Sequence, residues 1–501
     1  MLKLLTASQI RDADKHSIEN KFHISVDLME EAASAFVTAF VSYIPNRNES
    51  ISVYCGSGNN GGDGLAISRL LLEVGYKKIK VKVAWFNEGC TDDFNINLDR
   101  LNETGIPVHI FEAFDATLFA EDSDIIIDGL IGSGLNRPLS HDLKLLVEAL
   151  NALNRRIISI DIPSGLLSEG VLDTEATVIN SELTICFQRP KINFFFPESG
   201  QALQGFKIVP IGLDENYLQA LPSSWEFVEA ADIKNFITPR KRFTHKGTYG
   251  HALIVAGKKE TMGAALLATD ACLHAGAGLT TAFIPESGLV ALNTSQPEVM
   301  AILRESFNFF NPHLLDKYQA IAVGPGLGND NSTAALLYYL LENYKSPLVL
   351  DADALNILSE NESWLSMIPA NSILTPHIKE FDRLFGSHTS SWDRIETAKQ
   401  QAEKYQIIII VKNQHSFIVM PDGRVRINST GNPAMAVGGM GDVLTGIIAA
   451  FLAQGYSPEN AATISCYVHG LAGDILKIKG GMNNIPPRYI IKSLPVVISD
   501  C

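Results

Sequence analysis

The sequence predicts an α/β protein of two domains, each with a parallel sheet covered by helices. Short apolar runs that are typical of buried strands alternate with longer helical segments. This alternation loosens in the polar stretch at 213–230 and then restarts. The 501 residues exceed a single ordinary core, because one domain usually holds about 100–200 residues. We therefore expect one domain at 1–224 and a second at 225–501.

Local patterns predict the elements of the first domain. Thr6 to Gln9 form a capping box that opens a helix. Apolar residues recur every four positions between 25 and 44, which predicts an amphipathic helix. The strand at 51–55 leads into the stretch GSGNNGGDG and a helix that ends near Val74, with Gly75 as its C-cap. Further apolar runs predict strands at 79–86, 124–129, 155–165, 183–187 and 206–212.

The second domain repeats the alternation. Helical segments lie between its apolar runs, and the last of them contains DVLTGIIAAFLAQG at 442–455. The apolar runs predict strands at 251–257, 279–285, 320–326, 347–353, 372–377 and 407–412. Because strands that alternate with helices form parallel sheets, we expect a parallel sheet here too.

The composition excludes several classes of protein. The formal net charge of −15 argues against nonspecific binding to nucleic acid and against docking on a membrane surface. No window approaches the roughly 20 apolar residues of a membrane span, and the first residues do not have the pattern of a signal peptide. The six cysteines lack metal-like spacing, so we expect reduced thiols in a cytoplasmic protein.

Polar residues follow three predicted strands of the first domain. Asn59 to Asp63 follow one strand, Asp128 ends another, and Asp161 and Ser164 follow a third. In an open parallel sheet, ligands bind beyond such strand ends. The glycines let backbone N–H groups approach an anion, and the polar side chains offer oxygen ligands. One glycine-rich turn is as often only a tight turn, and one such Asp is often a helix cap, but three together favour a site.

The motifs GSGNNGGDG, DGLIGSGLNRP and DIPSG together resemble the YjeF N-terminal domain, the NAD(P)H-hydrate epimerase family, over most of residues 1–220. The resemblance implies a Rossmann-like three-layer fold and interconversion of the R and S epimers of a hydrated nicotinamide ring. It implies that Asp161 contacts the altered ring, and this residue is the candidate acid–base. The hydrate and its phosphates would contact Asn59, Asn60, Gly61, Gly62, Asp63, Gly132, Ser133, Gly134, Leu135, Asn136, Arg137 and Pro138.

The same resemblance implies a potassium ion held by Asn60, Asp128 and Ser164. The chemistry of these residues agrees with this. A large monovalent cation suits a few neutral oxygens and one carboxylate, whereas Mg²⁺ usually requires more negative charge.

A second set of strand-end motifs lies in the second domain. In NPAMAVGGMGDVLTG, at 432–446, three glycines precede an apolar helix and Asp442 lies in its first turn. Backbone N–H groups at a helix start can hold phosphoryl charge, and an adjacent Asp can accept a proton from an attacking hydroxyl. The motifs GPGLG, LDADALN, TPH and VKN end other strands of the same sheet, which favours a site over a simple glycine turn.

These motifs, in this order, resemble the YjeF C-terminal domain, a ribokinase-like family of ADP- or ATP-dependent (S)-NAD(P)H-hydrate dehydratases, over about residues 230–495. The resemblance implies that a nucleotide, with Mg²⁺, phosphorylates the ring hydroxyl and that loss of phosphate regenerates NADH or NADPH. Asp442 would be the base. The nucleotide would contact Lys412, Asn413, Gln414, His415, Ser416 and Gly441, and the hydrate would contact Ala264, Gly326, His377 and Asp442.

The sequence departs from the family patterns at a few positions. Asn413 stands where glycine is usual, although asparagine can adopt the same positive φ. Ser416 keeps a hydroxyl where Thr is usual. The stretch LMEEAA at 28–33 lacks the glycine expected near its end.

Two alternatives remain open from the residues alone. One is a ribokinase-like small-molecule kinase fused to a nucleotide-binding domain, which would release a stable phosphorylated product. The other is a binding protein that retains the fold as a nucleotide sensor, although Asp161 and Asp442 argue against it. His377 follows Pro at a strand end, where a histidine is as often an N-cap as a ligand. The expected partners are the hydrates NADHX and NADPHX, ADP or ATP, and further copies of the chain in a homo-oligomer.

Overall fold

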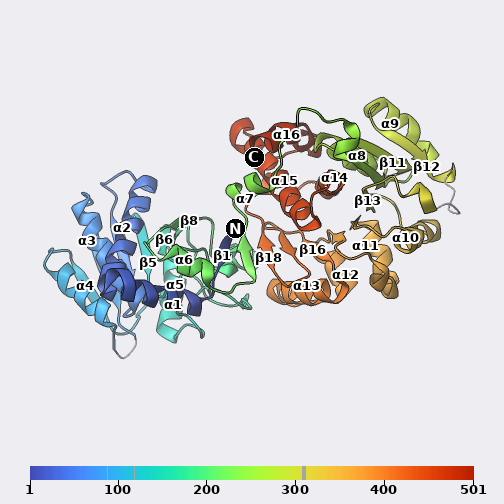
Figure 1. Cartoon of the computed structure of the whole chain (residues 1–501). Helices are drawn as coiled ribbons and strands as arrows, with labels where there is room; N and C mark the ends of the chain where they lie inside the picture. Colours follow the sequence, from blue (N-terminus) through green and yellow to red (C-terminus); the bar gives the residue numbers. More distant parts are fainter. Residues whose placement is uncertain (87–88, 118, 307–311) are drawn as a thin grey trace. The chain divides into compact units, whose positions relative to one another are not determined.

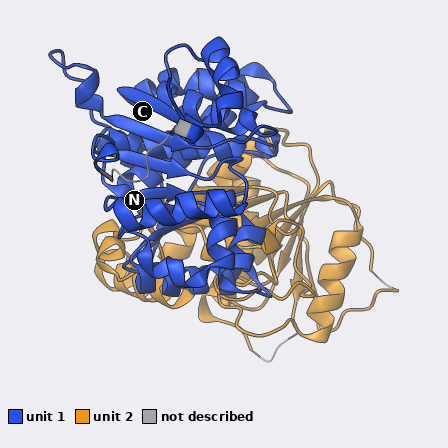
Figure 2. Cartoon of the chain, turned by 90° about the vertical axis from the view of Figure 1, so that its right-hand side faces the viewer, with its two compact units in different colours: residues 1–2, 224–501 blue, residues 3–223 orange. Residues whose placement is uncertain are grey.

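Two β-sheets lie within the computed structural model, which describes residues 1–86, 89–117, 119–306 and 312–501 (Figure 1). Lys3–Ser223 form an N-terminal unit, and Met1–Leu2 with Ser224–Cys501 form a C-terminal unit (Figure 2). The change of unit after Ser223 falls in the polar stretch where the alternation of strands and helices loosens. Both units are α/β, as the sequence predicts. No helix of the described residues is long and apolar enough to cross a membrane.

The sheet of the N-terminal unit is parallel, with the strand order β4-β3-β2-β5-β6-β7-β8. Its strands are β2 (Ile51–Cys55), β3 (Ile79–Ala84), β4 (Val108–Phe111), β5 (Ile125–Gly129), β6 (Arg156–Ile160), β7 (Leu183–Phe187) and β8 (Phe206–Val209). The residues of β2 and β5 are all buried, which explains their continuous apolar runs. Successive strands leave β2 in one direction to β3 and β4 and in the other to β5. The order therefore reverses between β2 and β5, where an open α/β sheet forms a ligand crevice.

The helices of the N-terminal unit are α1 (Ala7–Ser17), α2 (Ser25–Tyr43), α3 (Asn59–Glu73), α4 (Asp92–Asn102), α5 (His141–Ala152) and α6 (Glu215–Ala220). The helices α2, α3 and α4 pack against one another and lie together in Figure 1. The predicted capping box is present at the start of α1, where the Thr6 hydroxyl accepts from the Gln9 backbone N–H. Ala33, at the end of the LMEEAA stretch, is fully buried within α2, so the helix accommodates an alanine there.

The sheet of the C-terminal unit has the order β9-β18-β17-β16-β15-β14-β13-β10-β11-β12. Its strands are β9 (Trp225–Phe227), β10 (His251–Val255), β11 (Leu279–Ile284), β12 (Met300–Leu303), β13 (Ala320–Val323), β14 (Leu348–Leu350), β15 (Ile373–Leu374), β16 (Ile408–Val411), β17 (Phe417–Val419) and β18 (Val425–Ile427). Strand β10 pairs in parallel with β11 on one side and with β13 on the other. The strand order reverses between β10 and β13.

The prediction of a wholly parallel second sheet is wrong at one end. Strands β16, β17 and β18 pair antiparallel. The loop between β16 and β17 holds only the residues Lys412 to Ser416, and a crossover to a parallel strand needs a dozen or more. The loop length therefore dictates a hairpin, and the predicted nucleotide-binding segment is the turn of this hairpin.

The helices of the C-terminal unit are α7 (Ala230–Phe236), α8 (Met262–His274), α9 (Leu289–Ser295), α10 (Asn331–Asn343), α11 (Asp353–Glu360), α12 (Ile378–Phe385), α13 (Ser391–Tyr405), α14 (Met440–Ala453), α15 (Pro458–Gly480) and α16 (Pro487–Asp500). Small residues hold α8 and α14 close together. A Cβ on Gly446 of α14 would lie 2.1 Å from the carbonyl oxygen of Ala268 on α8. This contact fixes the position of α14, whose first turn carries Asp442.

Gly446→Ala tests this packing. The added methyl would push α14 away from a backbone atom that cannot rotate aside, so we expect the C-terminal unit to lose about 1–3 kcal/mol of unfolding free energy. The matched control is Gly263→Ala, because Gly263 lies in α8 with open space around its Cβ position. This change should stabilise the unit by about 0.5–1 kcal/mol. Urea denaturation of the full chain measures both, and equal midpoints for the two variants would contradict the packing argument.

Candidate active sites

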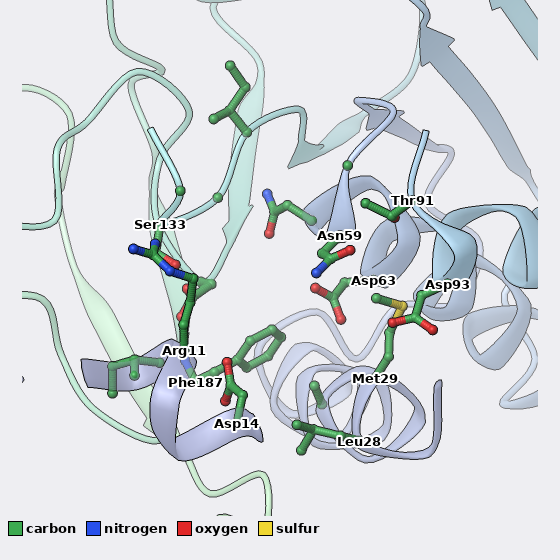
Figure 3. A pocket seen from close by; sticks show the side chains of 18 of the residues that line it. Arg11, Asp14, Leu28, Met29, Asn59, Asp63, Thr91, Asp93, Ser133 and Phe187 are labelled. Atoms are coloured by element: carbon green, nitrogen blue, oxygen red, sulfur yellow. The ribbon is translucent and has the colours of Figure 1, made fainter. Parts of the chain in front are cut away.

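A cavity of about 540 Å³ lies in the N-terminal unit at the carboxyl ends of β2, β5 and β6 (Figure 3). Loops from these three strand ends contribute to its wall, at the point where the strand order reverses. The predicted residues that line the cavity are Asn59, Asn60, Asp63, Gly132, Ser133, Gly134 and Asp161. The strand-end motifs of the sequence therefore come together in one place.

Other predicted residues do not line this cavity. Gly61 and Gly62 are buried in the first turn of α3, and a Cβ on Gly61 would lie 1.8 Å from the carbonyl oxygen of Gly56. They allow the helix to start close to the end of β2. Leu135 and the exposed residues Asn136, Arg137 and Pro138 continue the loop after β5 away from the cavity lining. Their contact with the hydrate stays a prediction.

Asp161 has a buried cationic partner that sequence reasoning missed. The Nζ of Lys191 donates to Oδ1 of Asp161 at 2.7 Å, and the backbone N–H of Phe187 donates to the same oxygen at 3.0 Å. Only 4% of the Lys191 side chain is exposed. Burial opposes the charge on Lys191, but the adjacent Asp161 carboxylate prevails and raises the pKa of the lysine above its usual value. The pair is therefore ionised, with Asp161 as a fixed carboxylate in the cavity.

Asp161 is one of four carboxyl groups around the cavity. Figure 3 shows Asp14, Asp63 and Asp93 on three different helices, α1, α3 and α4. Burial and then the charge of Asp161 raise the pKa of Asp14 to about 6. Burial and the charges of Asp161, Asp14 and Asp93 raise the pKa of Asp63 well above its usual value. Adjacent carboxyl groups disfavour one another's ionisation, so Asp14 and Asp63 keep their protons to a higher pH than an exposed aspartate.

Sequence reasoning missed Arg11 and Asp14 as well as Lys191. A signal for Asp14 was present, because Ile10, Asp14 and Ile18 recur every four residues, and all three line the cavity, the first two from α1 and Ile18 from the turn that follows it. An acidic residue within an apolar helix stripe indicates a buried polar function. Lys191 carried no comparable signal, because it lies 30 residues from Asp161 in the sequence.

Two of the three predicted potassium ligands, Asp128 and Ser164, are hydrogen-bonded to each other, and the third, Asn60, lines the cavity. The fully buried Asp128 carboxylate accepts hydrogen bonds from the Ser159 hydroxyl, the Ser164 hydroxyl, and the backbone N–H groups of Ser164 and Leu130. Burial raises its pKa, against these hydrogen bonds, and no ion pair to it occurs among the described residues. The amide nitrogen of Asn60 is buried without a partner, and this side chain lies against Gly132.

The second candidate site is built around the N-terminus of α14. Gly439 caps the helix in a left-handed conformation, with φ of 93°. Asp442 follows in the first turn, where burial and then the charge of Asp351 raise its pKa to about 7. A carboxyl group with this pKa can accept a proton near neutral pH and is still partly ionised there.

Asp351, at the end of β14, is held as a carboxylate. The Nζ of Lys412 donates to its Oδ1 at 2.8 Å, and the Thr445 hydroxyl donates to its Oδ2 at 2.7 Å. Burial opposes ionisation of Asp351, but Lys412 and the hydroxyl lower its pKa below the usual value. A Cβ on Gly441 would lie 3.4 Å from Lys412 Nζ. The structure thus brings Gly441, Lys412 and Asp442 together as the sequence predicts.

The other predicted residues of this unit are the proposed hydrate contacts Ala264, Gly326 and His377. Gly326 and Ala264 are adjacent, since a Cβ on Gly326 would lie 2.9 Å from the Ala264 Cβ. His377 is the N-cap of α12, with its Nδ1 accepting from the Glu380 N–H at 3.2 Å and 52% of its side chain exposed. The N-cap role raised by the sequence is therefore present, and contact with the hydrate stays a prediction.

The hairpin turn between β16 and β17 differs in one detail from expectation. Asn413 does not adopt a positive φ. The backbone at this position therefore does not require the glycine that is usual in the family. Gln414 is exposed, and Ser416 is half-buried. His415 Nδ1 lies 3.2 Å from the carbonyl oxygen of Asn428, and burial lowers its pKa, which keeps the ring neutral.

Comparison with known proteins covers both sites. The family described as YjeF-related protein N-terminus matches residues 25–193, and the family described as NAD(P)H-hydrate dehydratase matches residues 252–496. A bifunctional NAD(P)H-hydrate repair enzyme from Moorella thermoacetica is 32% identical over 99% of this chain and 96% of its own length. The chain belongs to the family of bifunctional NAD(P)H-hydrate repair enzymes. The relative of the same description from Escherichia coli is 29% identical over 98% of this chain and 93% of its own length.

Solved structures resemble the C-terminal half of this repair-enzyme chain. A ribokinase-like superfamily protein from Enterococcus faecalis is 27% identical, covers 56% of this chain and 97% of its own, and has a TM-score of 0.51. An ADP/ATP-dependent NAD(P)H-hydrate dehydratase from Bacillus subtilis, co-crystallised with ATP and Mg²⁺, is 30% identical, covers 55% of this chain and 98% of its own, and has a TM-score of 0.50. The C-terminal unit is ribokinase-like, as predicted.

Asp442→Asn tests how much the buried carboxylate of Asp442 lowers the free energy of unfolding. Because the pKa of Asp442 rises from 3.8 in the unfolded chain to about 7 in the fold, the wild-type carboxylate destabilises the fold increasingly as pH rises from about 4 to 7. Asparagine has no such charge. The variant should therefore gain unfolding free energy over the wild type between pH 5 and 8, by up to about 4 kcal/mol before solvent screening.

Thermal unfolding at pH 5 and pH 8 measures this gain. The matched control is Glu342→Gln, which removes an exposed carboxylate from α10 of the same unit and should change neither midpoint. A gain for Asp442→Asn that shrinks toward pH 8 would contradict the assignment of a raised pKa.

Proposed function

We propose that the two candidate sites carry the two repair reactions of the family, with epimerisation of NADHX and NADPHX in the N-terminal cavity and dehydration at the N-terminus of α14. The arrangement of charge supports this assignment. In each unit an ionised aspartate, fixed by a lysine, lies near a carboxyl group whose pKa is raised toward neutrality. Each site can therefore move a proton and stabilise a positive charge at neutral pH.

At the first site, epimerisation inverts the ring carbon that carries the hydroxyl. A protonated carboxyl group, Asp63 or Asp14, donates a proton to this hydroxyl, and the ring nitrogen lone pair expels water to leave an iminium cation. The fixed carboxylate of Asp161 faces the cation and stabilises it. Water adds to the opposite face and returns a proton to the carboxylate that donated one, so the enzyme is unchanged.

At the second site, dehydration begins with Asp442 accepting the proton of the ring hydroxyl. The hydroxyl oxygen bonds to the terminal phosphorus of ADP or ATP, and the shortened nucleotide leaves. The first N–H groups of α14 face the transferred phosphoryl group and stabilise its charge. The carbon–oxygen bond then breaks, phosphate departs, and a proton lost from the neighbouring ring carbon restores the dihydronicotinamide.

The potassium site fits the residues that surround it. Asp128 is fully buried with only hydrogen-bond donors as partners among the described residues. A monovalent cation bound by Asp128, Asn60 and Ser164 would balance this charge and orient the start of α3.

Mg²⁺ would enter the second site with the nucleotide, and Asp351 and Asp442 supply carboxylates nearby. The expected homo-oligomer and cytoplasmic location stay predictions.

Incubation of the full chain with NADH hydrate and ADP tests the two assignments. The wild type should restore the absorbance of NADH from both epimers. Asp442→Ala should stop recovery from either epimer, whereas Asp161→Ala should leave only the R epimer unused, each with a rate loss of about 10²–10⁴-fold in its own step.

The two variants serve as controls for one another. Asp442→Ala should still interconvert R and S epimers, which chromatography separates, and Asp161→Ala should still dehydrate the S epimer. If both variants match the wild type, the assignment of these residues is refuted. Accumulation of a stable phosphorylated hydrate by the wild type would instead support the kinase alternative.

Potassium dependence gives a separate test of the N-terminal site. Asn60→Ala removes one proposed ligand, so the K⁺ concentration that gives half-maximal epimerisation should rise about 10–100-fold. Epimerisation is followed in buffers where tetramethylammonium replaces K⁺ at constant ionic strength. The dehydration rate of the S epimer by the same variant is the internal control, and an unchanged K⁺ requirement would remove Asn60 from the ligand set.

A further inference from the structure

The N-terminal cavity presents an electrostatic problem for its proposed substrate. A dinucleotide hydrate carries at least two phosphate charges, and the cavity is lined by the carboxyl groups of Asp14, Asp63, Asp93 and Asp161. Its lining includes two cationic side chains, Lys191 and Arg11. Lys191 is already bonded to Asp161 and is buried. Arg11 is therefore the one cationic side chain of the described lining that is available to an incoming anion.

Arg11 is free to take this role. Among the described residues it donates no hydrogen bond and forms no ion pair, although it lies near enough to Asp14 to lower that residue's pKa in part. It belongs to α1, three residues before Asp14. In Figure 3 its side chain extends from α1 toward the loop that carries Ser133.

The loop that faces Arg11 has unused hydrogen-bond donors. The backbone N–H of Ile131 donates to the Ser164 hydroxyl at 2.8 Å, and that of Leu135 donates to the Gly132 carbonyl at 3.4 Å. Between them, the N–H groups of Gly132, Ser133 and Gly134 donate to no acceptor within the described part of the chain. Three successive free N–H groups that line a cavity form a site for anion oxygens.

We infer that Arg11 binds the phosphate next to the nicotinamide ribose, beside the 132–134 loop whose contact with the hydrate the family resemblance already implies. This inference rests on the proposed epimerase function. Helical rise places Arg11 only about 4.5 Å along α1 from Asp14, which interacts with Asp161. The phosphate within reach of Arg11 is therefore the one nearest the reacting ring. This phosphate is common to NADHX and NADPHX, so Arg11 contributes to the binding of both substrates.

Arg11→Ala tests the inference. Starting from the R epimer without nucleotide, so that dehydration is off, KM should rise about 10–100-fold for NADHX and for NADPHX alike, because one charge-assisted contact is lost. Because Arg11 also lowers the pKa of Asp14, kcat is compared at the pH optimum of each variant, where it should stay within about twofold. Arg11→Lys retains the charge but not the planar guanidinium, and its KM should fall between those of the wild type and Arg11→Ala.

Lys15→Ala is the matched control, since it removes the same charge from an exposed position on α1. Its KM should equal that of the wild type. Dehydration of the S epimer with ADP by Arg11→Ala should also be unchanged, which shows that the variant is folded. An unchanged KM for Arg11→Ala, a loss shared by Lys15→Ala, or a loss confined to NADPHX would overturn the inference. Failure of the wild type to interconvert epimers would instead refute the proposed function.

Discussion

Both sites depend on backbone segments that pack too closely to admit a Cβ atom. A Cβ on Gly61 would lie 1.8 Å from the carbonyl oxygen of Gly56, and one on Gly324 would lie 1.7 Å from that of Asp351. In the N-terminal unit this contact joins the end of β2 to the start of α3. In the C-terminal unit it joins the end of β13 to the end of the neighbouring strand β14. The loop tips therefore converge where the strand order reverses, and polar residues from separate strands share one site.

The two units reach a similar arrangement of charge with unrelated sequences. In one, Lys191 forms a buried ion pair with Asp161, and burial and then the charge of Asp161 raise the pKa of Asp14 to about 6. In the other, Lys412 holds Asp351 ionised while Asp442 retains its proton up to about 7. A carboxylate that is fixed by a lysine is a permanent negative charge, and it disfavours a second one nearby. The fold thus raises the pKa of each proton donor or acceptor first by burial and then by a fixed carboxylate beside it, and the lysine partly offsets this charge.

The sequence predicted those parts of the sites that local patterns encode. Polar residues after apolar runs and glycine-rich turns located Asn59, Asn60, Asp63, Asp161 and Asp442, and the family resemblance assigned their roles. Lys191 and Arg11 were missed, because nothing in their local sequence distinguishes a buried partner from a surface cation. The antiparallel hairpin after β16 was missed for a different reason. Its strands are only three or four residues long, which is too short for a periodic signal.

The contribution of α1 extends the N-terminal site beyond the segment that the N-terminal family model matches. The matched region begins at residue 25, whereas α1 ends at Ser17 and still places Arg11 and Asp14 on the cavity. The Ala7 N–H at its start donates to the Glu169 carboxylate at 3.2 Å, from the segment that follows β6. The helix is thereby tied to the loop that carries Asp161. Since a charged group acts on its neighbours only from a fixed position, this anchorage allows α1 to set both the charge and the protonation of the cavity.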